Sequence, residues 1–229
     1  MEQALTVSMV LSDPTRYYIY QYLSELNEEV SVLEIAKKFN IHPNVARLHL
    51  SKLEQAHMLQ SQTKKTGKGG RPSRLYSLAN KEIQLNFPYR DYKLLATMAM
   101  EVVQELGEQG EQILYKTGYK YGQEILETHL NSTPSDMTIE NKIEKLRHIS
   151  NIIGIYPRFE YVKHKNTIFF SIHNCPFKDL AQKKPELVCK MHSQLIKGML
   201  DSLFKNIELQ EGENMMEGCS SCSYKAFLW

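Results

Sequence analysis

The fold of the N-terminal part of this chain is decided by the stretch Ser31-Val-Leu-Glu-Ile-Ala-Lys-Lys-Phe39, the connection Asn40-Ile-His-Pro43 and the stretch Asn44-Val-Ala-Arg-Leu-His-Leu-Ser-Lys-Leu-Glu54. Apolar residues recur at helical spacing in both stretches, at Val32, Ile35, Ala36, Phe39, Ala46, Leu50 and Leu53. Pro43 suits the first turn of the second helix, where a missing N–H costs nothing. Two short helices joined by a tight turn indicate a helix-turn-helix.

A basic hairpin follows these helices. Residues 58–62 and 74–78 read as strands, and the loop 64–72 between them is rich in lysine and glycine. No acidic residue occurs between positions 62 and 80. Two helices followed by a basic-tipped hairpin are the plan of a winged helix that binds duplex DNA.

The contacts with DNA follow from helical periodicity. If the apolar stripe of the second helix faces the core, its opposite face points to the major groove and presents Asn44, Arg47, Leu48 and Ser51. Arg47 can form paired hydrogen bonds to guanine, and Lys52 at the flank suits a phosphate. The expected phosphate contacts of the wing are Lys64, Lys65, Lys68, Arg71 and Arg74, with Arg71 able to reach a narrow minor groove. The alternative is that the basic run is only a solvated loop.

Charge and length favour a two-part protein. Residues 1–80 carry ten Lys and Arg against seven Asp and Glu, whereas the other 149 residues carry eighteen against nineteen. The positive excess therefore lies where DNA is expected to bind. The N-terminus shows no signal peptide and no apolar run is long enough for a membrane span, so a cytoplasmic protein without a membrane partner is expected.

We divide the chain into residues 1–80, the DNA-binding domain, 81–153, a helical linker, and 154–229, a sensor domain. A helix over about 89–106 carries a coiled-coil-like seam of Tyr92, Leu95, Ala99, Val102 and Leu106. This seam predicts a homodimer that reads an inverted-repeat operator, although the stripe can also pack on its own domain. A second helix, 111–130, is expected to face a neighbour through Leu114, Gly118, Tyr121, Gly122 and Ile125, and a third covers 138–153.

The C-terminal part has a strand pattern. Residues 158–163 and 167–173 read as a hairpin, 185–204 as a helix, and 206–210 and 223–227 as two further strands. This order predicts a small antiparallel sheet of ββαββ topology with helices on one side. The whole chain is therefore expected to be an α+β protein with an N-terminal winged helix.

All four cysteines lie in this last segment, at Cys175, Cys189, Cys219 and Cys222. In a cytosolic chain such a group favours metal or redox chemistry over structural disulfides. Four thiolates suit a tetrahedral zinc site or an iron–sulfur cluster. Three alternatives stay open: a redox pair at 219–222, buried cysteines acting as small apolar residues, and no metal chemistry.

Several of these motifs resemble a known family. The segments 11–16, 31–39, 45–53 and 70–78 resemble the ArsR-type winged-helix regulators, and the Gly70-Arg-Pro wing is similar to the SufR-like repressors of iron–sulfur cluster assembly genes. The segments around Cys175, Cys189 and Cys222 resemble the sensor of that subgroup. The resemblance implies that these three cysteines bind an iron–sulfur cluster. It leaves the fourth ligand open among Cys219, His192 and His173.

The predicted function is that of a transcription regulator, a repressor by resemblance, whose operator binding depends on the cluster. One rival is a winged-helix regulator with a zinc site or with a pocket for a small apolar ligand; the pocket residues would be Tyr115, Tyr119, Tyr121, Phe169 and Phe170. The other rival is a thiol oxidoreductase. The sequence shows no nucleophile–base pair, phosphate loop or paired carboxylates, so we expect no enzyme.

Overall fold

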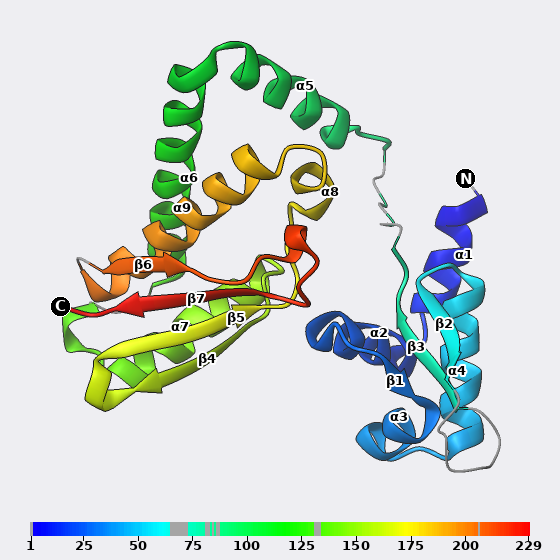
Figure 1. Ribbon diagram of the computed structural model, residues 1–229. Helices are drawn as coiled ribbons and strands as arrows, with labels where there is room; N and C mark the ends of the chain where they lie inside the picture. The colour runs from blue at the N-terminus through cyan, green and yellow to red at the C-terminus, as the bar shows by residue number, and fades with distance from the viewer. Residues whose placement is uncertain are drawn as a thin grey trace. The chain divides into compact units, whose positions relative to one another are not determined.

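The computed structural model describes residues 2–64, 73–80, 83, 85, 88–130, 134–205 and 207–229. The chain forms two compact units, Met1–Arg90 and Asp91–Trp229 (Figure 1). The predicted linker region, 81–153, therefore does not stand alone. The helices within 106–153 pack into the second unit, where Leu126, Ile143, Leu146 and Ile149 join the core that covers one face of the C-terminal sheet.

The first unit is a winged helix. Its helices are α1 (Glu2–Leu11), α2 (Pro14–Leu26), α3 (Val32–Phe39) and α4 (Pro43–Gln55), and its strands are β1 (Val30–Ser31), β2 (Leu59–Lys64) and β3 (Ser73–Leu78). Strand β3 lies between β1 and β2, and both pairings are antiparallel. The predicted helix-turn-helix and hairpin are confirmed. Helix α1 and the two-residue strand β1 were not predicted from the sequence.

Local chemistry sets the ends of α3 and α4. Ser31 caps α3 through a reciprocal pair of hydrogen bonds with Glu34, and Asn40 ends it in the left-handed conformation. Pro43 occupies the first turn of α4, as predicted, and the His42 side chain accepts a hydrogen bond from the Asn44 N–H. The largest fully buried side chains of this unit are Ile19, Leu23, Ile35, Leu50, Leu53 and Tyr76.

The second unit is a layer of helices on an antiparallel sheet. Its longer helices are α5 (Tyr92–Glu105), α6 (Gly107–His129), α7 (Ile139–Ile152) and α9 (Pro185–Phe204), and a single turn forms α8 (Lys178–Ala181). Its strands are β4 (Pro157–Val162), β5 (Thr167–Ile172), β6 (Glu208–Glu211) and β7 (Cys222–Phe227), in the spatial order β4-β5-β7-β6. The predicted hairpin forms as β4 with β5, and the two further predicted strands pair with each other as β6 and β7.

One face of this sheet is buried under helices. Ile168, Phe170 and Ile172 of β5 join Tyr224 and Ala226 of β7 in this layer. Helices α6, α7 and α9 cover them with Leu126, Ile143, Leu146, Ile149, Leu195, Ile196, Met199, Leu200 and Leu203. Side chains alternate along a strand, so Phe169 and Ser171 face the other way, away from the helices.

Helices α6 and α9 pack at backbone distance. A Cβ atom on Gly122 would lie 1.9 Å from the Leu195 carbonyl oxygen, and one on Gly118 would lie 2.6 Å from the Met191 carbonyl oxygen. Gly198 of α9 meets the Tyr119 carbonyl oxygen in the same way, at 2.1 Å. The predicted facing role of Gly118 and Gly122 is confirmed. That of Tyr121 is wrong, because its side chain is 54% exposed.

Candidate functional site

Helix α4 presents a polar face to solvent. Ala46, Leu50 and Leu53 are fully buried, as the apolar stripe predicted. The opposite face exposes Asn44, Arg47, Leu48 and Lys52, and Ser51 is half-buried. Arg47 Nη1 donates a hydrogen bond to Asn44 Oδ1 at 3.2 Å. The side chains that were expected to read base edges therefore stand together on one exposed face, and their contacts with DNA stay a prediction.

The strands of the wing carry only part of the predicted phosphate contacts. Lys65, Lys68 and Arg71 lie outside the described residues. Lys64 is exposed and forms an ion pair with Glu29, with an Nζ–Oε2 distance of 3.7 Å. Because an exposed ion pair is weak, Lys64 can exchange Glu29 for a DNA phosphate.

Arg74 has a structural partner that the sequence did not predict. Its Nη2 donates to both carboxylate oxygens of Glu54, at 2.8 and 2.7 Å, and its Nε donates to Ser61 Oγ at 2.8 Å. Its guanidinium also lies over the Tyr76 ring. These partners compete with a phosphate for Arg74, whose side chain is 52% exposed, so its contact with DNA stays a prediction. Its donors join β3 to the end of α4 and so position the wing against the recognition helix.

Three of the four cysteines meet at one cavity in the second unit. Cys175 follows β5, Cys189 lies in α9 and Cys222 begins β7. All three line a cavity of about 30 Å³ together with His192 and Asn214. Strand ends, a helix and a turn converge there, as expected. Cys219 is not among the lining residues that the structure describes.

Hydrogen bonds from the backbone reach two of these sulfur atoms. The Met215 N–H donates to Cys222 Sγ at 3.4 Å, and the Phe177 N–H lies where it lowers the pKa of Cys175. Donors of this kind stabilise a thiolate and are a usual tuning element around metal-bound sulfur. The Cys222 thiol donates a hydrogen bond to Asn214 Oδ1, and a hydrogen bond with the Asn214 side chain lowers the pKa of Cys189.

Burial acts against ionisation of the same thiols. Desolvation raises the pKa of Cys175 to about 12 and also raises the pKa of Cys189 and of Cys222. Without a cation to offset the cost of burying thiolates, these groups would stay protonated. Binding of a cation would release protons from this site.

His192 is the polar group most deeply enclosed at this cavity. It is 5% exposed, its Nδ1 lies 3.7 Å from Cys175 Sγ, and its Nε2 has no hydrogen-bond partner among the described residues. Burial lowers the pKa of His192 to about 4, so the imidazole is neutral near pH 7. His173, the other histidine considered as a fourth ligand, is not among the residues that line the cavity, and its Nε2 is 3.0 Å from Ser171 Oγ.

The cysteine and histidine side chains at this cavity are of the types that bind a metal through thiolates, but in the arrangement of the described residues they are not close enough to one another to coordinate it. Within the described ranges, no three Cys, His, Asp or Glu side chains stand close enough together to hold a metal ion. The unpartnered nitrogen of His192 and the N–H groups aimed at sulfur nevertheless suit a bound cation. Rotation of side chains around the cavity is therefore needed to close a coordination sphere.

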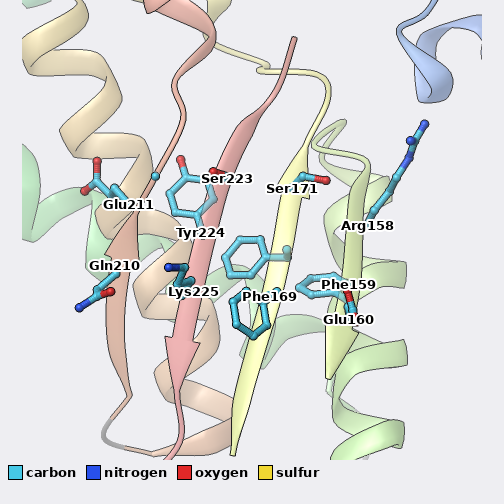
Figure 2. Close-up of a pocket in the computed structure, with 12 residues that line it drawn as sticks. Arg158, Phe159, Glu160, Phe169, Ser171, Gln210, Glu211, Ser223, Tyr224 and Lys225 are labelled. Atoms are coloured by element: carbon cyan, nitrogen blue, oxygen red, sulfur yellow. The ribbon is translucent and has the colours of Figure 1, made fainter. Parts of the chain in front are cut away.

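A second hollow lies on the sheet, with a volume of about 440 Å³. Figure 2 shows Phe169 of β5 between Glu160 of β4 and Lys225 of β7, with Arg158, Ser171 and Ser223 along the next row of the sheet. A planar aromatic surface with cations beside it can bind a flat molecule that carries a negative group.

The predicted aromatic pocket is formed only in part, because Phe169 and Phe170 line this hollow whereas Tyr115, Tyr119 and Tyr121 do not. Tyr119 donates a hydrogen bond to Asp201 at 2.9 Å, and Tyr115 donates to Glu111 at 3.3 Å. Tyr121 is exposed, and Phe170 stacks on Tyr224 in the core. The three tyrosines belong to α6, and each of the two hydrogen-bonded ones is held by a carboxylate away from the hollow.

Comparison with known proteins gives a family match and a set of similar solved structures that includes the following two. Residues 11–61 match the model of a family described as "Helix-turn-helix domain". A subunit 3 of the trafficking protein particle complex from Naegleria fowleri, covalently bound to palmitic acid, aligns at 16% identity with a TM-score of 0.42, over 60% of this chain and 90% of its own. The phenol-responsive sensory domain of the transcription activator PoxR with phenol aligns at 17% identity with a TM-score of 0.47, over 80% and 89%.

A search of curated proteins found no match. The family match, together with the three-stranded wing sheet, supports a DNA-binding transcription regulator of the winged-helix type. It does not extend to the SufR-like subgroup. Among the described helices, none is long and apolar enough to cross a membrane.

Proposed function

We propose that this protein is a transcription regulator whose winged helix binds operator DNA under the control of a metal centre in the second unit. The observation that carries the proposal is the convergence of Cys175, Cys189, Cys222 and His192 on one cavity. The three cysteines are half-buried, whereas His192 is buried with no hydrogen-bond partner for its Nε2 among the described residues, which core packing alone does not explain.

The resemblance to SufR-like repressors makes an iron–sulfur cluster the first candidate, and a single zinc ion is the alternative. The cavity of about 30 Å³ has room for about two water molecules and so suits a single ion as it stands. A cluster would require the segment 212–216, which lines the cavity, to move outward. An iron–sulfur centre would make the site sensitive to oxidants and to the availability of iron. A zinc ion would instead hold its ligands together as a structural site.

A metal at this site would join three parts of the fold. Cys175 belongs to the segment after β5, Cys189 to α9 and Cys222 to β7. Helix α9 in turn packs on α6 through Gly118, Gly122 and Gly198, and α6 continues from α5. Because the metal binds only the folded arrangement of these elements, it stabilises that arrangement by mass action.

Helix α5 supplies the proposed dimer contact. Its residues Tyr92, Leu94, Leu95, Met98, Val102 and Leu106 are all exposed large apolar side chains. A row of such residues on one helix marks an interaction surface. A second copy of this chain is the proposed partner, because two recognition helices about one DNA turn apart, roughly 34 Å, read an inverted repeat. Metal loss would change the geometry of α5 and release the operator, as in a repressor.

The proposal is tested on full-length protein purified without oxygen. We expect stoichiometric iron with labile sulfide, or stoichiometric zinc, and operator binding that changes at least fivefold when the metal is removed at constant salt. Cys175→Ser should lose both the metal and the response. Equal affinity of the metal-loaded and metal-free proteins for operator DNA would refute metal control, and absence of any metal would refute the centre itself.

The hollow over Phe169 favours a second candidate function, in which the effector is a flat anionic molecule. Benzoate is a suitable probe, with benzyl alcohol as the uncharged control. Saturable benzoate binding that is weakened by Phe169→Ala and by Lys225→Gln would support an effector site there. No saturable shift in a titration followed by NMR would exclude this class of ligand.

A further inference from the structure

The four cysteines do not form one set in this fold. Cys175, Cys189 and Cys222 line the cavity, whereas Cys219 lies outside its lining in the segment before β7. A site built from all four thiolates would need Cys219 to turn inward past Cys222, three residues further along the same segment. Three sulfur donors therefore leave one position of a tetrahedral site to another residue.

His192 is placed so that its imidazole can supply the fourth ligand of a tetrahedral site. It lies three residues after Cys189 in α9, so the two side chains project from the same face of the helix. Its ring lines the cavity, and its Nδ1 already lies within 3.7 Å of Cys175 Sγ. The edge of the ring against Phe177, with centroids 5.2 Å apart, restricts its orientation.

The hydrogen bonding of His192 is incomplete without a ligand. A buried imidazole nitrogen that lacks a partner costs free energy, and native structures rarely leave such groups unpaired. Nε2 of His192 has no hydrogen-bond partner among the described residues. Because the side chain is only 5% exposed, bulk water does not supply a partner. A cation in the cavity would satisfy an imidazole nitrogen and three sulfur atoms together.

We propose that His192 is the fourth protein ligand of the metal centre and that Cys219 is not a ligand. The inference rests on the proposed function, because it assigns the ligands of the same site. A set of three cysteines and one histidine is a known structural zinc set and also accepts cobalt(II) as a spectroscopic probe. On metal binding, three thiol protons leave for solvent and the neutral imidazole contributes a nitrogen lone pair.

The experiment loads metal-free, full-length protein with cobalt(II) under anaerobic conditions and records the stoichiometry and the visible spectrum. The wild type and Cys219→Ser should bind one cobalt per chain with the same affinity and the same bands, because neither the sulfur count nor the nitrogen donor changes. His192→Ala should bind at least tenfold more weakly. His192→Cys should restore binding, with stronger sulfur-to-cobalt absorption and with ligand-field bands at lower energy.

Far-UV circular dichroism and thermal unfolding of the metal-free variants separate ligand loss from misfolding, and His192→Cys gives a second reading if His192→Ala does not fold. Loss of cobalt in Cys219→Ser with normal binding by His192→Ala would overturn the assignment and leave metal control intact. A wild type that takes up neither cobalt, zinc nor an iron–sulfur cluster would refute the proposed function as well. Four cysteine ligands would also be revealed by a wild-type spectrum identical to that of His192→Cys.

Discussion

Lys93 in the first turn of α5 forms an ion pair with Asp179 of α8, 86 residues further along the chain. Helix α8 lies in the segment between Cys175 and Cys189, and Lys184 of the same segment donates a hydrogen bond to Gln104 near the end of α5. Figure 1 shows α8 close to the beginning of α5. These two contacts connect the cysteine-bearing segment directly to the helix proposed to mediate dimerisation.

We expect Lys93→Glu to reduce the effect of metal removal on operator affinity, because repulsion from Asp179 uncouples α5 from α8. The pair is partly exposed, and such pairs contribute about 0.2–1 kcal/mol, which corresponds to about a fivefold change at most. The double variant Lys93→Asp, Asp179→Lys should restore the response. Lys120→Glu, which breaks an exposed pair with Glu124 within α6, is the control. An unchanged ratio of metal-loaded to metal-free Kd in Lys93→Glu would contradict this coupling.

Arg47 and Lys52 should differ in how they support DNA binding. Arg47→Ala removes a side chain directed at base edges, so operator binding should weaken by about 1–3 kcal/mol while binding to unrelated DNA changes little. Lys52→Gln removes a phosphate contact, so it should weaken both and reduce the salt dependence by about one unit of slope. Fluorescence anisotropy with operator and scrambled duplexes at several salt concentrations measures both effects. Equal losses on the two duplexes for Arg47→Ala would exclude base reading by this residue.

The exposed face of α5 predicts a dimer that a single charge disrupts. Leu95 is 63% exposed and Val102 is 59% exposed, so Leu95→Asp leaves the fold of one chain largely intact while burying a charge at any interface formed there. We expect a shift from dimer to monomer by analytical ultracentrifugation. Glu101→Lys, an exposed change on the same helix, should remain dimeric. A monomeric wild type would contradict the proposed seam.

Gly122 should be the most sensitive residue in the contact between α6 and α9. Gly122→Ala places a methyl group where only 1.9 Å separates it from the Leu195 carbonyl oxygen, so the helices must move apart. Overpacking of this kind costs about 1–3 kcal/mol. Denaturant unfolding should show this loss, whereas Thr117→Ala on an exposed position of α6 should change stability by less than about 0.5 kcal/mol. Equal stability of the two variants would show that the packing relaxes freely.

The stability of the metal-free protein should fall as the pH drops from about 6.5 to about 4. Burial lowers the pKa of His192 to about 4 in the folded state, so the unfolded chain binds its proton first over this interval. The shift corresponds to a limit of about 3 kcal/mol. His192→Phe should remove most of this dependence, and His164→Gln, at an exposed position in the same unit, should not. The free energy of unfolding at pH 7 and pH 5 checks this, and equal slopes in wild type and His192→Phe would contradict it.

Much of the fold could be predicted because the signals are local. The helical spacing of Ile35, Ala46, Leu50 and Leu53 and the position of Pro43 located α3 and α4 to within a residue or two. The apolar run within residues 167–173 likewise located β5. Strand β1 was missed because two residues carry no period, and only its pairing with Tyr76 and Leu75 makes it a strand.

The site was predictable only in part. The grouping of cysteines in the last quarter of the chain pointed to one site, and three of them do line one cavity. The separation of Cys219 from this set and the enclosure of His192 depend on which residues of α9 and of the segment before β7 line the cavity. Arg74 was assigned to DNA because its charge is visible in the sequence, whereas its partner Glu54, 20 residues away, is apparent only in the folded chain.

The sequence by itself therefore determined the helix-turn-helix, the strand and helix periods and the types of side chain available for chemistry, because those properties depend on residues within a few positions of one another. Tertiary structure alone decided which cysteines share a cavity, which histidine is enclosed with them, and which arginine is bound within the fold. These outcomes depend on burial and on contacts between residues that are distant along the chain, and no local pattern records such contacts.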